Sequence, residues 1–467
     1  MSLIASVAVA QDQQAGFNTC LQCHFAKQEG FNPAHSFAAS NCTICHGGDS
    51  SAFTQDSAHE DLVAYPGDLA NASQSCGQCH ADRVNDVVGG NLMHTGQGMV
   101  RVTREVIDGS TGAPGSINLQ SLGHGVADSM LRKLCASCHL GQPKTQHGHD
   151  VMFDRGGGCL ACHVNEYPEN AHPALTTRVS DARCFGCHSR SGRISLSFTG
   201  LAEIEAPVDA GAGPRLADGR YVERMPADVH YQAGMSCVDC HKAGDVMGNH
   251  ADARNQRDAV EAECTDCHEP HAEVYGHGED HERLTCAACH SQWAPQCFGC
   301  HMEYDPDGEQ WDHVERELTA GRWHEKRWNV RNGLPALGVN ASDKIDVFVP
   351  GMIMTVSHPD LEDERFIRLF GPLSPHTTGP ARSCESCHRS TTALGLGQGR
   401  LYKENGELRF EPAEALLRDG LAADAWTNLD NSLGGRTPFA GQRPLTPAEM
   451  RAIIEANIRR PDSAPAR

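Results

Sequence analysis

The motif Cys-x-x-Cys-His occurs eleven times in this chain of 467 residues and accounts for all 22 of its cysteines. Random placement of the same cysteines and histidines would give about 0.06 such motifs, so the repetition reflects a chemical requirement. Numbered in chain order, motifs 1 to 11 are Cys20/Cys23/His24, Cys42/Cys45/His46, Cys76/Cys79/His80, Cys135/Cys138/His139, Cys159/Cys162/His163, Cys184/Cys187/His188, Cys237/Cys240/His241, Cys264/Cys267/His268, Cys286/Cys289/His290, Cys297/Cys300/His301 and Cys384/Cys387/His388.

This spacing suits the covalent attachment of haem. Two thiols three positions apart can form thioethers with the two vinyl groups of one porphyrin, and the adjacent histidine can bind the iron as the proximal ligand. A disulfide or zinc framework also uses Cys-x-x-Cys, but it does not require histidine after the second cysteine in all eleven copies. We therefore predict eleven heme c groups and no cysteine free for other chemistry.

Sixteen histidines remain after the eleven proximal ones are subtracted from the total of 27. Eleven irons need eleven sixth ligands, so the sixteen histidines are sufficient. Methionine is an alternative ligand, and the chain has twelve methionines. Two imidazoles give lower potentials than a histidine–methionine pair, so we predict low-potential haems. The distal candidates are His35, His59, His94, His124, His149, His172, His230, His250, His277, His313, His324, His358 and His376, while His147, His271 and His281 are alternatives within two crowded clusters.

The composition is too poor in apolar residues for a conventional core around each motif. Hydrophobic residues make up 39% and aromatic residues 6% of the chain, which also has 47 glycines and 24 prolines. About thirty residues accompany each motif up to His301, which is too short a segment to bury a core of its own. Porphyrin faces are therefore expected to replace side-chain packing, and dense haem packing is expected to leave little surface for a merely solvent-exposed histidine.

Two long gaps between motifs divide the first ten into groups of three, three and four. The domain prediction is a signal-peptide remnant at 1–10, three-haem modules at 11–100 and 101–190, a β-hairpin linker at 191–236, a four-haem module at 237–301 and a one-haem domain at 302–467. Residues 135–188 and 264–301 also read as an internal repeat, because both end in Cys-Phe-Gly-Cys-His and carry Gly-His pairs before the middle motif.

Local patterns predict several elements between the motifs. Alternation predicts strands over Met99–Ile107 and Arg193–Phe198, each followed by an Asp-Gly turn signal, and a strand pair over Asp346–Val356 broken at Pro350-Gly351. Thr446-Pro447-Ala448-Glu449 predicts a helix start with a capping box. Asp305-Pro306-Asp307-Gly308 resembles the beginning of a calcium loop but lacks its full ligand spacing, so a turn is favoured.

The formal net charge of −21 excludes some classes of partner. A strongly acidic surface repels nucleic acid and anionic membranes and favours basic redox partners or oxidised metal ions. The longest apolar run, Leu3 to Ala10, is too short to span a bilayer and reads as the end of a secretory signal with an Ala-Val-Ala cleavage site. No transmembrane segment is therefore expected.

With these motifs the chain resembles the multihaem c-type cytochromes. The segment from Cys286 to His301 and the sequence Pro375-His376-Thr377-Thr378 are similar to stretches in such cytochromes of metal-respiring or metal-oxidising bacteria. The resemblance implies mostly loops and short helices around stacked haems, a few short β-hairpins, and a small α/β C-terminal segment. It also implies that the protein is secreted and lies in the periplasm, at the cell surface or in the extracellular space.

The function that this resemblance implies is electron transfer along the haems to or from an external donor or acceptor, with no catalytic residue. One alternative is a multihaem oxidoreductase that reduces a nitrogen or sulfur oxyanion at one haem with an open coordination site. Such enzymes often replace the histidine of one motif with lysine, and this chain has no Cys-x-x-Cys-Lys. A filament of electron-transferring subunits is a further alternative, and the sequence leaves the oligomeric state open.

Overall fold

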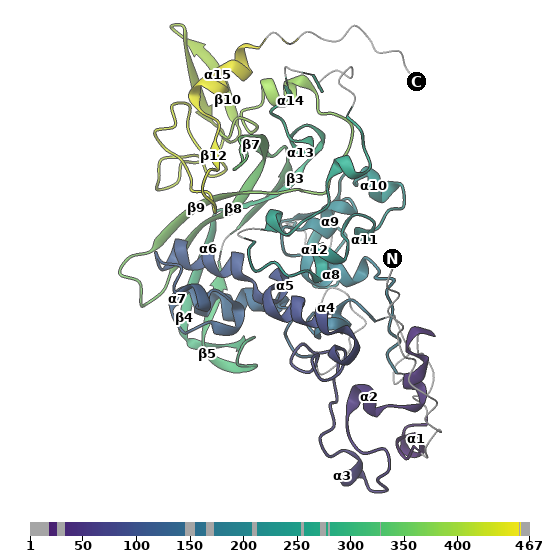
Figure 1. The fold of residues 1–467 in the computed structure, drawn as a ribbon. Coiled ribbons are helices and arrows are strands. Elements are labelled where there is room, and N and C mark those ends of the chain that lie inside the picture. Colours follow the sequence, from purple (N-terminus) through teal and green to yellow (C-terminus); the bar gives the residue numbers. More distant parts are fainter. Residues whose placement is uncertain are drawn as a thin grey trace.

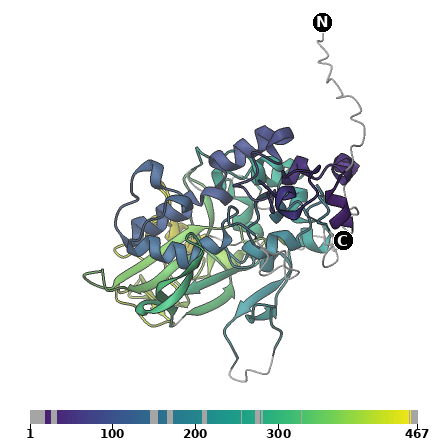
Figure 2. The ribbon, with the colours of Figure 1, turned by 90° about the horizontal axis from the view of Figure 1, so that it is seen from below.

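The computed structural model describes residues 18–25, 33–144, 155–164, 172–207, 213–253, 256–270, 277–278, 281–326, 328–456 and 458. Short helices and turns dominate the N-terminal part, and the main β-sheet lies in the C-terminal part (Figure 1). Figures 1 and 2 both place the N-terminal helices, drawn in purple, at the opposite end of the molecule from the green strands. None of the helices in these ranges has the length and apolar character needed to cross a membrane.

The helices are mostly one or two turns long, as expected for a chain that is interrupted by an attachment motif every few tens of residues. In chain order they are α1 (Cys20–Cys23), η2 (Pro33–Ser40), α2 (Thr43–His46), α3 (Gln55–Ala58), α4 (Gly77–Gly90), α5 (Leu92–Thr95), α6 (Gln97–Ile107), η3 (Pro114–Ser116), η4 (Leu119–Ser121), α7 (Val126–Met130), η5 (Leu131–Cys135), η6 (Ala136–Cys138), η7 (Gly158–Ala161), α8 (Ala182–His188), α9 (Ile194–Phe198), α10 (Val229–Gln232), α11 (Cys237–Cys240), α12 (Ala243–Met247), η8 (Gln256–Asp258), η9 (Cys264–Asp266), α13 (Cys286–His290), α14 (Cys384–His388) and α15 (Pro447–Glu455).

Two of the predicted strands are helices. Met99–Ile107 lies within α6, and Arg193–Phe198 is the N-cap residue and body of α9, so both strand predictions are wrong. In α6 the buried side chains include Val100, Thr103 and Ile107, whose spacing of three to four residues defines one helical face. Burial of this face outweighs the local preference of β-branched residues for strands.

A hairpin is nevertheless present in the gap between motifs 6 and 7, as predicted. It consists of β1 (Leu201–Ile204) and β2 (Tyr221–Arg224), which pair antiparallel. The predicted turn residue Gly219 has a φ of +87°, a left-handed conformation that glycine adopts without a Cβ clash.

The main sheet has six strands, and its long strands hold the C-terminal part together. The order is β12-β7-β8-β4-β5, with β9 also pairing with β8, and every pairing is antiparallel except β4 with β8. Its strands are β4 (Cys300–Asp312), β5 (Glu317–Glu325), β7 (Ala336–Val339), β8 (Ile345–Ser357), β9 (Arg365–Pro372) and β12 (Arg443–Pro444), and two smaller pairs are β3 (Ala294–Phe298) with β6 (Asn329–Gly333) and β10 (Gly399–Glu404) with β11 (Glu407–Pro412).

At two places in this region where an interruption or a turn was predicted, the strand continues through a β-bulge. Residues Asp346–Val356 belong to the single strand β8, so the prediction of a strand pair is wrong, and the pairing of β8 with β9 shifts register between Pro350 and Met352. Likewise β4 continues through Asp305–Gly308, and its pairing with β5 shifts register between Asp305 and Glu309. The turn that was favoured at Asp305–Gly308 is therefore a bulge within a strand, where the Asp305 carboxylate accepts a hydrogen bond from the Asp307 backbone N–H at 3.1 Å.

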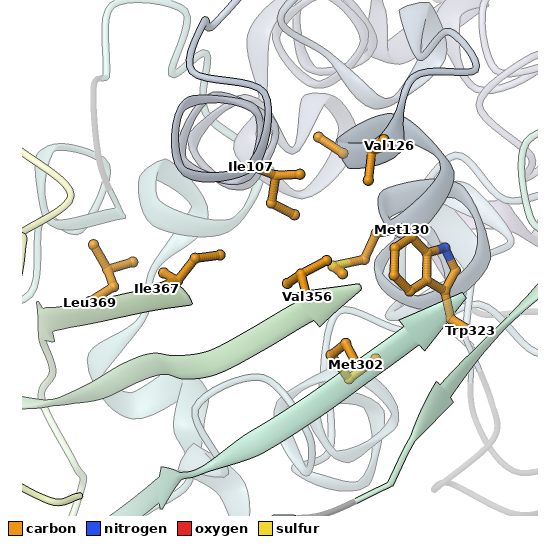
Figure 3. Packing of buried hydrophobic residues seen from close by; sticks show 9 residues of the cluster. Ile107, Val126, Met130, Met302, Trp323, Val356, Ile367 and Leu369 are labelled. Atoms are coloured by element: carbon orange, nitrogen blue, oxygen red, sulfur yellow. The ribbon is translucent and has the colours of Figure 1, made fainter. Parts of the chain in front are cut away.

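Helices from early in the chain cover one face of the sheet. Ile107 of α6 and Met130 of α7 pack with Val356, Trp323 and other residues of β4, β5, β8 and β9 in one buried cluster (Figure 3). The same helices are joined by a buried ion pair in which Arg104 donates two hydrogen bonds to Asp128, at 2.6 and 2.8 Å. Residues near motif 4 are therefore anchored to the sheet that follows motif 10.

The C-terminal helix α15 begins as predicted. Thr446 is its N-cap, Pro447 is the first helical residue, and Glu449 completes the capping box by accepting a hydrogen bond from the Thr446 N–H at 2.8 Å. Burial opposes ionisation of Glu449, but hydrogen bonds from Arg443, Thr446 and Arg283 outweigh it and lower the pKa of this carboxyl to about 2.

We expect Glu449→Gln to destabilise α15 by about 1 kcal/mol at neutral pH, because the charge-assisted cap is lost. A free glutamate has a pKa of about 4.3, so the contribution of Glu449 is complete above about pH 5 and is lost as the pH falls toward 2. Hydrogen exchange of residues 447–455 between pH 2 and 7 measures both effects. Glu407→Gln, at an exposed position in β11, is the control, and equal pH profiles for E449Q and the parent would contradict the prediction.

Candidate functional site

Ten of the eleven motifs are placed in a helical turn, which brings their three functional side chains to one side. In motifs 1, 3 and 7, for example, the histidine N–H donates to the carbonyl of the first cysteine at 2.8–2.9 Å. This i to i+4 bond sets the second cysteine and the histidine, at positions i+3 and i+4, on the same helix face as the first cysteine. Both thiols and the imidazole can then reach a single porphyrin.

Motif 10 is the exception. Cys297 and Phe298 lie in β3, Cys300 and His301 lie in β4, and Gly299 between the strands has a φ of +77°. Motif 6 has the same Cys-Phe-Gly-Cys-His sequence but lies in helix α8. The two ends of the apparent internal repeat therefore differ in secondary structure, because β3 and β4 are held by their pairing with β6, β5 and β8.

Six of the predicted attachment cysteines are exposed, and the other sixteen are partly buried. Cys79 of motif 3 is an exposed example: it lies in the first turn of α4, whose buried side chains begin only at Val84. The polypeptide around such a motif is too short to cover the thiol by itself. An exposed thiol stays accessible to a porphyrin vinyl group, so thioether formation at Cys79 stays a prediction. The six are Cys23, Cys79, Cys240, Cys264, Cys267 and Cys286.

None of the 22 cysteines, all of which lie in described parts of the chain, forms a disulfide, but thiols of different motifs lie close together. Five such pairs are within hydrogen-bonding range: Cys20–Cys42, Cys76–Cys159, Cys138–Cys187, Cys184–Cys237 and Cys264–Cys286. In four more pairs, burial raises the pKa of the first thiol, and the charge of the second thiol, which belongs to another motif, raises it further. These pairs are Cys45–Cys76, Cys162–Cys184, Cys240–Cys267 and Cys289–Cys387.

These nine interactions, five through hydrogen bonds and four through charge, are called the thiol series, and they link most of the motifs. They join motifs 1, 2, 3, 5, 6, 7, 8, 9 and 11 in that order, and motif 4 branches from motif 6 through Cys138 and Cys187. The cysteines of motif 10 lie within hydrogen-bonding range of each other, and Cys300 Sγ lies 3.3 Å from Glu325.

Seven motif histidines face a second histidine across a nearly constant distance. Their ring centroids are 6.0–6.3 Å apart, and the planes of the two rings differ by 31–88°. With the motif histidine first, the pairs are His24–His59, His80–His35, His46–His172, His268–His230, His241–His376, His290–His277 and His388–His281.

This separation is what two imidazoles on opposite sides of one metal ion require. A metal–imidazole bond is about 2 Å long and the nitrogen lies about 1.1 Å from the ring centre, so the two centres are about 6.2 Å apart. In the described ranges, no three or more His, Cys, Asp or Glu side chains converge in a way that could hold a metal ion. The paired rings therefore fit an ion whose other ligands come from a macrocycle, as in haem.

The hydrogen bonds of the rings leave the correct nitrogen available. In seven of the paired histidines, and in His163 of motif 5, Nδ1 lies 2.7–2.9 Å from a backbone carbonyl or carboxylate, so Nδ1 carries the proton and Nε2 keeps its lone pair for a metal. They are the motif residues His46, His163, His241, His290 and His388, and the facing residues His172, His230 and His376.

Two of the eight rings are held by buried carboxylates instead of carbonyls. Asp228 Oδ1 accepts from His230 Nδ1 at 2.8 Å, and Asp245 Oδ2 accepts from His241 Nδ1 at 2.8 Å. Both carboxylates are only 3% exposed, so solvent weakens the interactions little. The sequence interpretation missed both aspartates, although Asp245 stands at the i+4 position of His241, where a helical side-chain pair is expected.

We expect Asp228→Asn and Asp245→Asn each to raise the midpoint potential of one haem by some tens of millivolts. A carboxylate makes the imidazole a stronger donor and favours the oxidised iron, and 1 kcal/mol of such preference corresponds to about 40 mV for one electron. The measurement is a spectroelectrochemical titration of the holoprotein. Asp239→Asn is the matched control, since Asp239 lies within motif 7 but caps Ser236, and an equal shift in all three variants would contradict the prediction.

The pair formed by motif 4 is closer and more deeply buried. The rings of His139 and His94 stack with centroids 5.1 Å apart and planes 14° from parallel, and Gln120 lies 2.9 Å from His94 Nε2. His139 Nε2 and His94 Nδ1 are both buried without a hydrogen-bond partner. Burial lowers the pKa of His139 to about 4, so this ring is neutral and its unpaired nitrogen suits a metal ligand.

The three remaining motif histidines face other groups. His163 Nε2 lies 3.5 Å from Met247 Sδ, and methionine is a known axial ligand of haem iron. Burial lowers the pKa of His188, whose Nδ1 has no hydrogen-bond partner. His301 Nε2 lies 3.2 Å from Ser357 Oγ and 3.6 Å from the Glu364 carboxylate.

The other distal candidates are placed away from the seven pairs. His124 is 81% exposed and lies 3.8 Å from Glu315, and His324 lies 3.6 Å from Asp305. His250 Nε2 lies 3.0 Å from the Gly244 carbonyl, and burial lowers the pKa of His313. His358 packs on Tyr304 with centroids 4.2 Å apart.

The crowded histidine clusters could not be resolved from sequence. The structure pairs both His277 and His281 with motif histidines, although only His277 was favoured. His147, His149 and His271 lie outside the described residues. The distinguishing signal is three-dimensional, because His281 faces His388, which is more than one hundred residues away in the sequence.

A search of curated proteins found that the chain is similar to the dissimilatory sulfite reductase MccA of Wolinella succinogenes. The two sequences are 23% identical over 185 residues, a region that covers 34% of this chain and 25% of that protein. The chain thus matches about a quarter of the length of this relative. No family model matches the chain, and no solved structure matches it significantly.

Proposed function

We propose that this chain is an electron-transfer protein that carries c-type haem at its eleven Cys-x-x-Cys-His motifs. The observation that carries the proposal is the set of seven facing histidine pairs with a common centroid separation near 6.2 Å. Histidines that merely fill a surface have no reason to repeat this distance beside seven attachment motifs. The similarity to a sulfite reductase supports a redox role.

In this proposal the residues of the chain hold and orient the cofactor, and bound haem supplies reversible one-electron chemistry at its iron. The cysteines fix each group at a defined place, and the carbonyl-bound imidazoles present Nε2 in a fixed orientation. The thiol series links motifs 1, 2, 3, 5, 6, 7, 8, 9 and 11, and this supports a path for electrons along these nine motifs.

The proposed setting is outside the cytoplasm, with an external electron donor or acceptor as partner. The net charge of −21 supports a positively charged partner surface or an oxidised metal ion, since opposite charge raises the association rate. A second candidate function is reduction of a small substrate at one haem with an open position. It is favoured by the similarity to a sulfite reductase.

Mass spectrometry of the holoprotein together with EPR tests the proposed function. We expect eleven haem additions per chain and low-spin ferric signals from the seven bis-imidazole sites. His376→Ala should convert one haem from low to high spin, whereas His124→Ala, at an exposed position beside Glu315, should not. A chain that carries few haem groups, or an H376A spectrum identical to the parent, would overturn the proposal.

A further inference from the structure

We propose that residues 374–382, which we call the ligand segment, position the iron ligands of motifs 7, 8 and 9 jointly, and that Thr377 anchors this segment. The inference rests on the proposed function, because it requires haem at these three motifs. It adds to that function a positioning residue and a coupling between neighbouring haem groups. All three motifs have facing histidine pairs, with ring centroids 6.0–6.3 Å apart.

The ligand segment supplies the facing histidine of motif 7 directly. His376 lies opposite His241, with ring centroids 6.1 Å apart, and its Nδ1 donates to the Ser374 carbonyl at 2.8 Å. The φ of His376 is +54°, a left-handed conformation that residues other than glycine rarely adopt. Such a conformation persists only where the surrounding contacts hold the backbone, so the position of this ring depends on how the segment is fixed.

The segment also contacts the carboxylate that holds the facing histidine of motif 8. The Thr378 N–H donates to Asp228 Oδ2 at 2.7 Å, and Asp228 Oδ1 accepts from His230 Nδ1 at 2.8 Å. The Thr378 carbonyl accepts from the Val229 N–H at 3.0 Å. The Asp228 side chain is only 3% exposed, so the segment reaches His230 through a single buried carboxylate.

The next residue of the segment holds the proximal histidine of motif 9. The Gly379 carbonyl accepts from His290 Nδ1 at 2.9 Å, and the Gly379 N–H donates to the His290 carbonyl at 3.0 Å. The packing here is close, since a Cβ on Gly379 would lie 2.7 Å from Gln292 Cγ. Three residues within four positions of the chain therefore reach the iron ligands of three different motifs.

The end of the segment joins the backbones of motifs 9 and 11. The Arg382 N–H donates to the Cys289 carbonyl at 2.9 Å. Its guanidinium donates to the carbonyls of Ala288 in motif 9 and Ser386 in motif 11, at 3.3 and 3.0 Å. A displacement of the segment would thus act on motifs 7, 8 and 9 at their ligands and on motif 11 at its backbone.

Thr377 fixes the segment through the backbone of Trp293 and not through a ligand. Its hydroxyl donates to the Trp293 carbonyl and accepts from the Trp293 N–H, the latter at 3.3 Å. Thr377 is 1% and Trp293 2% exposed, and the Trp293 indole N–H donates to the Pro226 carbonyl at 2.9 Å. Removing the hydroxyl deprives these buried backbone groups of this partner, which favours displacement of the segment.

This displacement has opposite consequences at motifs 8 and 9. At motif 9, His290 loses the carbonyl that makes it a strong donor, which favours reduced iron and raises the midpoint potential. At motif 8, Asp228 loses the Thr378 N–H that shares its charge, so more of the charge acts on His230 and the midpoint potential falls. A general loosening of the protein has no reason to produce shifts of opposite sign.

Thr377→Val keeps the shape of the side chain without its hydroxyl, and spectroelectrochemistry of the holoprotein measures the result. After mass spectrometry has shown haem on the peptides of motifs 7, 8 and 9, we expect the ratio of reduced to oxidised haem at fixed potential to rise at least about threefold at motif 9 and to fall by a similar factor at motif 8. Each shift is assigned by its disappearance when the two cysteines of that motif are replaced with alanine. EPR should also show a high-spin fraction from motif 7.

Thr377→Ser keeps the hydroxyl and should restore the parent potentials. Thr427→Val is the matched control, because Thr427 is also 1% exposed and its hydroxyl donates to the Leu433 carbonyl at 2.9 Å, outside the ligand segment and the motifs. If T377V does not fold, Gly379→Ala, which displaces the segment at Gln292, decides by the same two shifts.

The outcomes separate the inference from the proposed function. With haem present on all three motifs, unchanged potentials, shifts of a single sign at motifs 8 and 9, or the same shifts in T427V would each overturn the inference alone. Absence of haem from those peptides would instead count against the proposed function.

Discussion

Replacing Cys184 and Cys187 of motif 6 with alanine is expected to divide the path for electrons into two separate groups. Motif 6 takes part in three interactions of the thiol series, which are Cys162–Cys184 with motif 5, Cys184–Cys237 with motif 7 and Cys138–Cys187 with motif 4. Removing its haem leaves motifs 1, 2, 3 and 5 on one side and motifs 7, 8, 9 and 11 on the other. Transfer between these groups would then have to cross the width of a missing cofactor.

A photoreductant attached near the N-terminal end measures this effect. Phe53 is 80% exposed next to α3, and under the proposed function, in which all other cysteines are bonded to haem, Phe53→Cys would supply the only free thiol. In the F53C parent, illumination without mediators should reduce nearly all of the haem. In the C184A/C187A variant, the fast phase should be limited to the four haem groups of motifs 1, 2, 3 and 5.

Cys135→Ala with Cys138→Ala is the matched control, since motif 4 branches from the series and its loss leaves the path from motif 5 to motif 7 intact. This control should lose one haem but retain rapid reduction of the rest. Equal extents and rates of reduction in the two double variants would show that the thiol series does not describe the path.

Trp426→Ala is expected to cause the largest loss of stability in the C-terminal sheet, about 3–5 kcal/mol. Trp426 is fully buried, stacks on Phe370 with centroids 5.2 Å apart and planes 3° from parallel, and lies 4.7 Å from Phe348. The approach is so close that a Cβ on Gly338 would lie 2.3 Å from the indole. Removing the ring leaves a cavity that the paired strands β7, β8 and β9 cannot close.

Amide hydrogen exchange of β8 and β9, followed with increasing urea, measures this loss within the sheet. Trp311→Ala is the control, because Trp311 is 46% exposed and its removal should change stability by less than about 0.5 kcal/mol. A W426A sheet with the same protection as the control would show that the haem-binding segments, and not this aromatic cluster, determine the stability of the C-terminal part.

Local sequence signals succeeded where the structure depends on a few neighbouring residues. The capping box at Thr446 and the turn at Gly219 need only contacts within a few positions, and both are confirmed. The strand predictions over Met99–Ile107 and Arg193–Phe198 both failed. For Met99–Ile107, tertiary burial of a helical face decided between two conformations that the local pattern allows. The number of haem groups stays a prediction.

The sequence by itself determined where cofactors can be attached, because thioether chemistry and the proximal ligand need only five consecutive residues. Which histidine faces which motif was decided by the tertiary structure, since partners such as His241 and His376 are far apart in the chain. The same five residues, Cys-Phe-Gly-Cys-His, form a helix in motif 6 and parts of two strands in motif 10. Strand pairing outweighs local preference there, and it sets His301 Nε2 3.2 Å from Ser357 Oγ, whereas seven other motif histidines face an imidazole.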